Sequence, residues 1–364
     1  MTDERGASPA SAHASREAVP PRVAVVVGAG AVGSFLGGTL AAAGWDVTLV
    51  GRRGGGDGTP SPLAIDGPRK RRRTVSVRRV GSAEAAPGSP DVVILAVKVF
   101  DLAGALETAA RWPDAPLVTA QNGVGAEAAA ATARTSPLIA ASLTTAVEPT
   151  PDGVARRRKG GLGLAPVRGE TAALRRELRA GFADGGLPTV ACLDAAAMTW
   201  SKLLANLVAN ATSGLLDMDA GAVWADRAGF ELERRQLREA LAVMRAQGLR
   251  VVSLPGGQVR ALLFGLRLPA PVARPVLALA IGRARGGKHP SLRIRLRGGA
   301  GPTESPWLNG AVAEAGARLG VSVPVNAALA GLVDLAAEDP GTADRWRGNP
   351  AGLLTACDAR DEAG

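Results

Sequence analysis

A short apolar run followed by a glycine-rich hexapeptide is the feature that most constrains the fold of this chain. Val23–Val27 is a compact β-branched stretch, and the segment Gly28-Ala29-Gly30-Ala31-Val32-Gly33 follows it, ahead of a helix-forming run. In this pattern the first glycine permits a tight turn, the second lets the backbone approach a pyrophosphate, and the third lets helix and strand pack closely. The segment therefore predicts a strand, a turn and a helix that bind a dinucleotide.

Short β-branched runs alternate with alanine-rich runs over the first half of the sequence. Beyond the first strand, the expected strands are Val47–Val50, Val75–Val77, Val92–Val97, Leu117–Ala120, Leu138–Ala146 and Thr189–Cys192. The expected helices are Val32–Ala43, Leu102–Arg111 and Ala126–Arg134. Strands of this length that alternate with helices predict a mostly parallel sheet with crossover helices.

The β pattern fades after residue 193. Asp194 suits the N-cap of a helix through Ala195–Leu216, and further helical patterns run over Phe230–Gln247, Gln258–Phe264, Leu308–Leu319 and Asn326–Ala337. We therefore predict an α/β Rossmann domain over 22–193 and an all-α C-terminal domain over 194–345. The ends are expected to form a disordered tail (1–21) and a loose tail (346–364).

The composition excludes some classes of function. Basic residues number 43 against 33 acidic ones, and only five of the basic residues are lysines. Because arginine is so common here, the few lysines and the six asparagines are the more informative polar residues. Aromatic residues make up 3% of the chain, too few to provide stacking platforms among the basic clusters, so we expect no nucleic-acid binding.

Nothing in the sequence predicts a membrane span or a metal site. The first 20 residues lack the apolar core of a signal peptide, and the uncharged run Val23–Trp45 is better explained by a buried strand, a glycine turn and a packed helix. Cys192 and Cys357 are the two cysteines, and they offer no metal-ligand spacing. Two distant thiols are compatible with a reducing cytoplasm, where we expect the protein to act.

The loop after the second expected strand carries Arg52 and Arg53. An acidic residue at this place would bind the ribose 2′-hydroxyl of NAD, whereas arginine favours a 2′-phosphate. The sequence therefore favours NADP(H). Lys98 and the segment Gln121-Asn122-Gly123 follow two further strands at their carboxyl ends, where sheets of this kind bind ligands.

Lys202, Asn206 and Asn210 are spaced four residues apart on the long expected helix, so they form one polar stripe. Such a stripe on an otherwise apolar helix favours a functional role. A lysine ammonium can donate a hydrogen bond to a substrate carbonyl and deliver a proton as hydride arrives, which suits a reductase. Glu304 is a candidate carboxylate partner, although spacing alone equally fits an acid that leads into the next helix.

These residues occur in the order seen in the ketopantoate reductase family, which the chain resembles over about residues 22–338. The same order continues through Pro290-Ser291, Thr303-Glu304, Leu308-Asn309-Gly310 and Val323-Pro324-Val325-Asn326. The resemblance implies the fold of the 6-phosphogluconate dehydrogenase superfamily, with the active site in the cleft between a Rossmann domain and a helical domain. Helical domains of this kind often pair, so a homodimer is one expected assembly.

The resemblance also implies roles for individual residues. Lys202 would be the general acid, and Glu304 would hydrogen-bond the substrate oxygen. Asn122, Asn206 and Asn210 would hold substrate and cofactor, Ser291 would bind the substrate carboxylate, and Lys98 and Arg52 would line the NADPH site. The implied reaction is hydride transfer from NADPH to the ketone of 2-dehydropantoate, a small anionic 2-oxo acid, giving (R)-pantoate for pantothenate and coenzyme A synthesis.

Three departures from the family pattern all fall in the substrate half of the chain. Many relatives carry an acidic residue near the position of Arg295, and they read closer to Val/Ile-Asp where this chain has Ser305-Pro306. The Pro-rich insert at 254–287 is also longer than in compact members. Two alternatives therefore stay open: a reductase of the same fold for another 2-oxo acid or an imine, and a non-catalytic NADP(H)-binding protein. Retention of Lys202 and Glu304 favours an enzyme.

Overall fold

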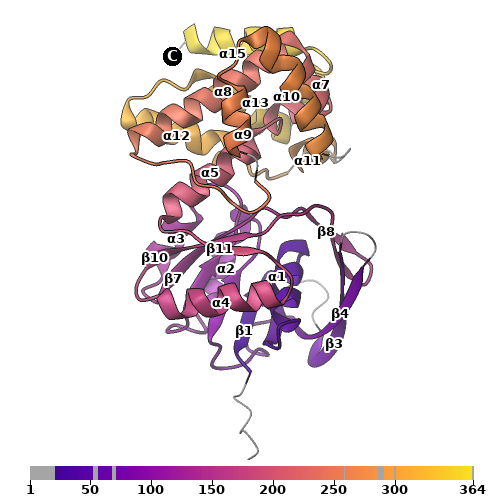
Figure 1. The fold of residues 1–364 in the computed structure, drawn as a ribbon, viewed down its shortest axis with the longest axis vertical. Helices are drawn as coiled ribbons and strands as arrows, with labels where there is room; N and C mark the ends of the chain where they lie inside the picture. The colour runs from indigo at the N-terminus through magenta and orange to yellow at the C-terminus, as the bar shows by residue number, and fades with distance from the viewer. Residues whose placement is uncertain are drawn as a thin grey trace, which may run out of the picture.

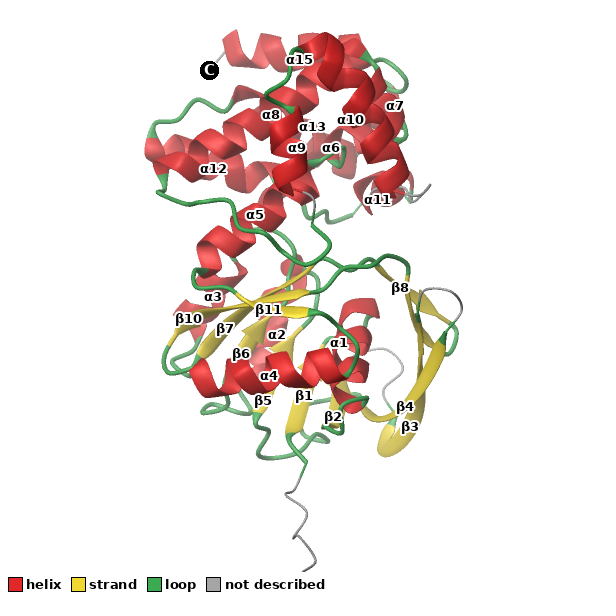
Figure 2. Ribbon diagram, viewed as in Figure 1, coloured by secondary structure: helices red, strands yellow, loops and turns green. Residues whose placement is uncertain are grey.

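The computed structural model shows two lobes joined by one helix, α5 (Ala195–Leu207) (Figures 1 and 2). It describes residues 21–51, 56–67, 71–257, 259–285, 291–298 and 301–362. Figure 2 shows all the strands in the lobe that precedes α5 and only helices in the lobe that follows it. The tail predicted at 1–21 lies outside the described residues except for its last position.

The N-terminal lobe is built on a single sheet, which has eleven strands among the described residues. They are β1 (Val23–Val27), β2 (Asp46–Val50), β3 (Asp57–Asp66), β4 (Arg72–Val80), β5 (Val92–Leu95), β6 (Leu117–Thr119), β7 (Leu138–Leu143), β8 (Val147–Thr150), β9 (Gly153–Arg156), β10 (Leu162–Arg168) and β11 (Thr189–Ala191). Their order in the sheet is β11-β10-β7-β6-β5-β1-β2-β4-β3-β9-β8. Most neighbouring strands are parallel, and only β10/β7, β3/β4 and β8/β9 are antiparallel. The predicted mostly parallel sheet is confirmed.

The register of the central strands brings their carboxyl ends to one edge of the sheet. Val27 at the end of β1 pairs with Val50 on β2 and with Leu95 on β5. Leu95 in turn pairs with Thr119 on β6. The residues that follow these strands therefore lie side by side at the edge where parallel sheets bind ligands.

Side chains of β1 alternate between two cores, as expected of a strand buried on both faces. Ala24 and Val26 belong to the core on the face covered by α1 (Ala31–Ala41) and α4 (Ala172–Asp184). Val25 and Val27 belong to the core on the opposite face, which is covered by α2 (Leu102–Ala109) and α3 (Ala126–Ala133). A 3₁₀ turn, η2 (Val99–Asp101), leads into α2. Strands β3, β4, β8 and β9 curl around α1 and contact it.

The C-terminal lobe is all helical among the described residues. Its elements after α5 are α6 (Ala211–Leu216), α7 (Ala220–Ala225), α8 (Arg227–Ala246), α9 (Val259–Gly265), α10 (Ala270–Arg285), α11 (Ser291–Arg297), the 3₁₀ turn η3 (Ser305–Trp307), α12 (Asn309–Leu319), α13 (Pro324–Glu338), α14 (Pro340–Asp344) and α15 (Pro350–Glu362). The first half of α5 packs on β7 and β10, and α5 also packs on α8. An α/β Rossmann-like domain followed by an all-α domain is therefore the observed fold class.

The C-terminal end corrects one prediction. The segment 346–364 was expected to be loose, but α15 packs against α13 and α8. Its Leu353 and Cys357 side chains are fully buried, and Arg235 on α8 forms an ion pair with Asp358 at 2.6 Å. Of the acidic residues that suggested a loose tail, Asp358 lies half-exposed on this helix. Among the described residues, no helix combines the length and the hydropathy needed to cross a bilayer.

Candidate active site

The glycine turn has the geometry that its sequence predicts. Gly28 has φ +111°, its N–H donates to Val50 O at 2.9 Å, and a Cβ on it would lie 2.8 Å from the Ala96 carbonyl carbon. A Cβ on Gly33 would lie only 1.8 Å from Gly28 O. Both positions therefore require glycine, because a side chain would collide with backbone atoms.

Gly30 differs from these two glycines because open space surrounds it. Apart from its neighbours in the chain, no described protein atom lies within 4 Å of the position that its Cβ would take. Gly30 is also the N-cap residue of α1, and no side chain caps that helix terminus. An open helix N-terminus at the carboxyl edge of a parallel sheet fits a pyrophosphate, because its backbone N–H groups and the helix dipole favour an anion.

The two predicted phosphate-binding arginines, Arg52 and Arg53, lie outside the described residues. The residue before them is placed, however. Gly51 donates its N–H to Val80 O at 3.0 Å, and a Cβ on Gly51 would lie 2.7 Å from the Ala29 Cβ. The loop that carries the arginines therefore starts directly beside the glycine turn.

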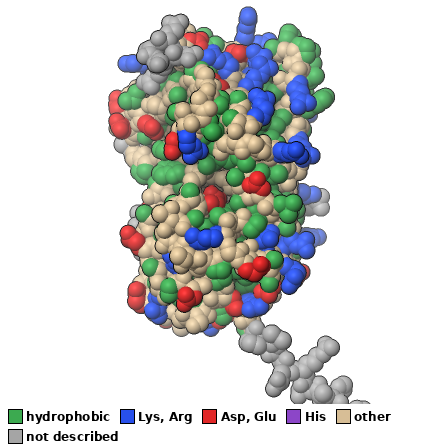
Figure 3. All heavy atoms as spheres, turned by 90° about the vertical axis from the view of Figure 1, so that its left-hand side faces the viewer, with side chains coloured by type: hydrophobic (Ala, Val, Ile, Leu, Met, Phe, Trp, Pro, Cys, Tyr) green, Lys and Arg blue, Asp and Glu red, His purple; other side chains and the backbone are tan. Residues whose placement is uncertain are grey.

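Lys98 and Glu304 meet across the cleft between the lobes. The Lys98 Nζ lies 2.6 Å from Glu304 Oε2, although the two residues are 206 positions apart in the chain. Lys98 follows β5 at the carboxyl edge of the sheet, and Glu304 precedes η3 in the helical lobe. Figure 3 shows the molecule narrowing between the lobes, with hydrophobic and acidic side chains in the waist. Lys98, which is predicted to line the cofactor site, and Glu304, which is predicted to contact the substrate, are thus neighbours.

The loop that carries Asn122 is held against the helical lobe by the two residues that follow Asn122. The Val124 N–H donates to Trp307 O at 2.9 Å, and a Cβ on Gly123 would lie 2.5 Å from that carbonyl oxygen. Gly123 has φ +90°, a backbone conformation that favours glycine. The loop after β6 therefore packs tightly on η3 and leaves the Asn122 side chain exposed beside it.

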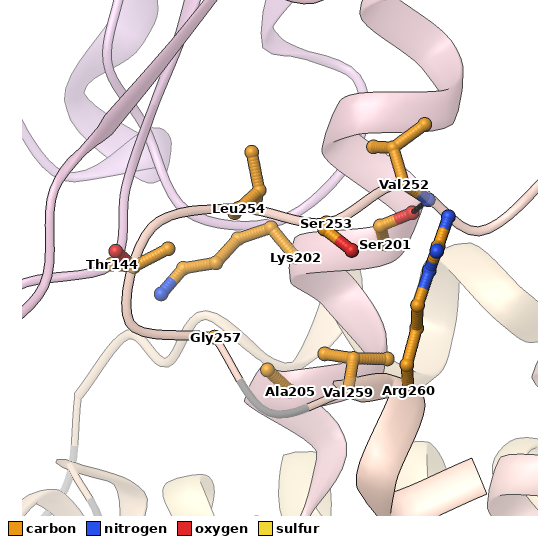
Figure 4. A pocket seen from close by; sticks show the side chains of 10 residues that line it. All are labelled: Thr144, Ser201, Lys202, Ala205, Val252, Ser253, Leu254, Gly257, Val259 and Arg260. Carbon is orange, nitrogen blue, oxygen red and sulfur yellow. Dashed lines mark hydrogen bonds between the residues drawn. The ribbon is translucent and has the colours of Figure 1, made fainter. Parts of the chain in front are cut away.

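Lys202 lies in the second half of α5 and lines a pocket to which both lobes contribute (Figure 4). The pocket holds about 310 Å³ of empty space, part of it open to solvent. It is lined by Thr144, Ser201, Lys202, Ala205, Val252, Ser253, Leu254, Gly257, Val259 and Arg260. In Figure 4 the Lys202 ammonium points toward Thr144 and away from Arg260. Glu304 and Asn122 are not among these lining residues.

Two hydroxyl groups hold the loop 252–257, which lines this pocket, against the rest of the structure. Ser201 Oγ accepts the Val252 N–H at 2.9 Å. Thr144 donates its hydroxyl to Pro255 O, and its oxygen accepts the Gly161 N–H at 2.9 Å. The start of the Pro-rich insert therefore closes over Lys202 and contacts the N-terminal lobe. This loop and Thr144 were not anticipated from the sequence.

The prediction of one continuous helix over Ala195–Leu216 is wrong. α5 ends at Leu207 and α6 begins at Ala211, and Val208 and Ala209 between them leave the helical conformation. Ala209 has φ +47°.

Lys202 and Asn206 share one helical face, but Asn210 lies beyond the break as the N-cap residue of α6. Asn210 Oδ1 accepts the Leu292 N–H at 3.4 Å, next to Ser291. Ser291 opens α11, and its side chain lies outside the described part of the structure.

Several buried polar atoms near these elements lack a hydrogen-bond partner among the described residues. They include Gln121 Oε1, Asn206 Nδ2 and Ser305 Oγ. Such an atom costs about 1–3 kcal/mol when it stays unpaired. Gln121 follows β6, Asn206 lies on α5 one turn after Lys202, and Ser305 begins η3. All three stand on segments at the junction of the two lobes.

A partly buried carboxyl group also lies near the start of α5. Glu127, in the first turn of α3, accepts a hydrogen bond from the Thr199 hydroxyl at 3.2 Å. Burial raises the pKa of Glu127, and the hydrogen bond from Thr199 only partly offsets this effect. No motif or spacing singles out this residue, because its environment depends on Thr199, which lies 72 positions later in the chain.

Both lobes of the chain match a known family. The sequence model described as ketopantoate reductase PanE/ApbA matches residues 24–165, and the model of that family's C-terminal domain matches residues 194–337. The chain belongs to the ketopantoate reductase family. It is therefore a pyridine-nucleotide-dependent oxidoreductase.

Individual relatives agree with this assignment. The chain is 31% identical over 322 residues to the 2-dehydropantoate 2-reductase of Halobacterium salinarum, a match that covers 86% of this chain and 99% of the relative. The structure of a PanE/ApbA family ketopantoate reductase from Ralstonia eutropha superposes with a TM-score of 0.71 at 25% identity, covering 88% and 99% of the two chains. A ternary structure of D-mandelate dehydrogenase with NADH and anilino(oxo)acetate has the same fold, with a TM-score of 0.70 at 17% identity over 88% and 99% of the chains.

Proposed function

We propose that this chain catalyses the NADPH-dependent reduction of 2-dehydropantoate to (R)-pantoate, the step that supplies pantoate for pantothenate and coenzyme A synthesis. The observation that carries the proposal is the position of Lys202 in a pocket formed by both lobes. The family assignment and the name of the Halobacterium salinarum relative support the choice of substrate.

The residues around the glycine turn fit the cofactor. The open space above Gly30 and the uncapped start of α1 suit the pyrophosphate. Arg52 and Arg53, which follow Gly51, would bind the 2′-phosphate, and Lys98 would lie near the sugar and phosphate groups at the carboxyl edge of β5. NADPH bound here supplies the hydride that reduces the ketone carbon.

On the substrate side, Lys202 would donate its proton to the ketone oxygen, so that the oxygen becomes the product hydroxyl as the carbon is reduced. Glu304 would accept a hydrogen bond from that hydroxyl, exchanging its contact with Lys98 for one with the substrate. Asn122, Asn206 and Asn210 would orient the substrate. Ser291 would bind the substrate carboxylate.

A second candidate is the same chemistry on a different 2-oxo acid. It is favoured by the segment around Glu304, which departs from the family pattern at Ser305-Pro306 and forms a 3₁₀ turn against Gly123. Arg295, another departure, donates to Pro302 O at 3.1 Å and so contacts the loop that leads to Glu304. These departures lie in the substrate half of the chain, so they bear on which 2-oxo acid is bound.

One experiment separates the two candidates. NADPH oxidation by the purified chain would be followed with 2-dehydropantoate and with a panel of other 2-oxo acids at equal concentrations. The proposal expects the highest kcat/KM with 2-dehydropantoate. A higher value with another acid would favour the second candidate, and NADPH binding without turnover of any acid would favour a non-catalytic role.

We further propose that the protein acts as a homodimer in the cytoplasm. Val272, Val276 and Leu279 follow one face of α10 and are each more than half exposed, which is unusual for side chains of this kind. A second copy would cover this face. Cys192 and Cys357 are both buried and form no disulfide with each other, which fits a reducing compartment.

A further inference from the structure

Glu233 is a fully buried carboxylate on α8, packed against the break between α5 and α6. One of its oxygens holds the break, and the other holds the start of the helix that follows. Oε2 accepts the Ala209 N–H at 2.8 Å, and Oε1 accepts the Thr212 hydroxyl at 2.6 Å. Ala209 lies in the break itself and Thr212 lies in the first turn of α6. One side chain therefore fixes both the break and the start of the next helix.

Gln236, one turn later on α8, extends this arrangement to the end of α5. Its amide nitrogen donates to Glu233 Oε1 at 2.8 Å and to Leu207 O at 3.4 Å. Its own oxygen accepts the Asn309 amide at 3.0 Å. Gln236 and Asn309 are also buried. Helix α8 thus holds the last carbonyl of α5 and an amide inside the break through a connected set of buried polar groups.

The break needs such support because of its backbone conformation. Ala209 has φ +47°, in the left-handed region that residues other than glycine rarely adopt. A residue stays in that region only where the surrounding structure holds it there. The hydrogen bond from the Ala209 N–H to Glu233 is the contact that meets this requirement.

The break determines how Asn206 and Asn210 are presented. Without it, the two residues would be one helical turn apart on the same face. With it, Asn206 stays on α5 with Lys202, and Asn210 turns toward the start of α11, where its side-chain oxygen accepts the Leu292 N–H. The relative placement of the two amides therefore depends on the conformation at Ala209.

We propose that Glu233 is a positioning residue of the active site: by holding Ala209 and Thr212 it sets the separation and direction of Asn206 and Asn210 for the substrate. This inference rests on the proposed function, in which both asparagines bind the 2-oxo acid. A carboxylate is required because its two oxygens accept from opposite sides. A glutamine has one acceptor oxygen, so its NH₂ group would face either the Ala209 N–H or the Gln236 amide nitrogen, both of which are donors.

The test compares Glu233→Gln with Glu231→Gln. Glu231 lies two residues earlier on α8, where it is partly exposed and pairs with Arg234, so its variant is a matched control. We expect Glu233→Gln to raise the KM for 2-dehydropantoate at least tenfold, with the NADPH dissociation constant within twofold of wild type. The control should match wild type in both. Equal kinetics for the two variants would overturn the proposal, as would an NADPH dissociation constant that rises in proportion to KM, because that result indicates general loosening.

A second readout does not depend on turnover. Amide hydrogen exchange of a peptide spanning residues 205–212 should be faster in Glu233→Gln than in Glu231→Gln, and equal exchange would overturn the proposal. If wild type fails to reduce 2-dehydropantoate, the proposed function fails, while this measurement still decides the role of Glu233. If Glu233→Gln does not fold, Thr212→Val and Thr212→Ser replace it. Thr212→Ser keeps the hydroxyl and should retain the wild-type KM, whereas Thr212→Val should raise it, and identical KM values would refute the inference.

Discussion

The Lys98 ammonium lies 2.6 Å from the Glu304 carboxylate and joins the two lobes of the molecule at the cleft between them. The Lys98 side chain is 53% exposed, whereas that of Glu304 is only 12% exposed. In the proposed reaction both groups face bound molecules. Substrate binding therefore has to compete with Lys98 for Glu304, and the ion pair is expected to loosen when the cleft is filled.

Replacing Glu304 by Gln should separate its catalytic role from its structural one. An ion pair with one half-exposed partner contributes at most about 1 kcal/mol, so the free energy of unfolding should fall by no more than that. The kcat should fall about 100-fold or more, because the neutral amide is a weaker acceptor for the product hydroxyl. Steady-state kinetics and thermal unfolding measure the two effects, with the exposed Glu314→Gln as control. Near-wild-type kcat would contradict the assigned role.

Two glycine substitutions should behave in opposite ways. Gly33→Ala places a methyl group 1.8 Å from Gly28 O, so this variant should be strongly destabilised or fail to fold. Gly30→Ala meets no described protein atom within 4 Å, so its melting temperature should stay close to that of wild type. Its methyl group would instead occupy space assigned to the pyrophosphate, and NADPH should bind about tenfold or more weakly. Unchanged NADPH affinity in Gly30→Ala would show that the cofactor lies elsewhere.

Coenzyme preference provides a separate test of the loop that follows Gly51. Removing both Arg52 and Arg53 by substitution with Ala should weaken NADPH binding by about tenfold or more, since a charged hydrogen bond contributes about 1.5–3 kcal/mol. Binding of NADH, which lacks the 2′-phosphate, should change by less than about twofold. Fluorescence titration with both nucleotides measures the ratio. A ratio that does not move would mean that other groups select the coenzyme.

The parts of this fold that depend on contiguous residues were predictable. The strand, turn and helix around Gly28–Gly33 are specified within about twenty residues, and the alternation of strands and helices specified the mostly parallel sheet. Strands β3, β8, β9 and β10 are absent from the predicted set. In β3, Pro60 and Pro62 interrupt the pattern, and their usual meaning is a break in a strand. Here they lie in a strand that is exposed over much of its length, where the normal apolar alternation is weak.

The parts that depend on distant contacts were not predictable. Nothing in the spacing of Lys98 and Glu304 shows that they meet. The break after Leu207 carries no glycine or proline, so the sequence reads as one helix. Only the packing of α8, with Glu233 facing Ala209, shows why the chain leaves the helix there. Lys202 and Asn206 could be selected from the sequence because rare polar residues stood on an apolar helix.

Lys202 is the residue on which the proposed chemistry depends most. Replacing it by Met keeps much of its length and removes the proton donor, so kcat should fall by about 10²–10⁴-fold. The NADPH dissociation constant should stay within about twofold, because the glycine turn lies on the other lobe. Lys159→Met, a substitution of an exposed lysine, is the control for loss of charge. A Lys202→Met variant with more than a tenth of wild-type kcat would remove the residue from the role of general acid.

The partly buried Glu127 should make stability depend on pH in a defined direction. Burial raises its pKa in the folded state above the ordinary value of about 4.3, so the folded protein retains a proton that the unfolded chain releases. This group therefore destabilises the fold increasingly as pH rises from about 4.3 to its folded-state pKa, and by a constant amount above it. Glu127→Gln removes the ionisation and keeps the acceptor for Thr199. The variant should therefore melt at a higher temperature than wild type at pH 8, and the difference should shrink toward pH 5. The exposed Glu107→Gln should show no such trend, and a Glu127→Gln advantage that grows as pH falls would contradict this explanation.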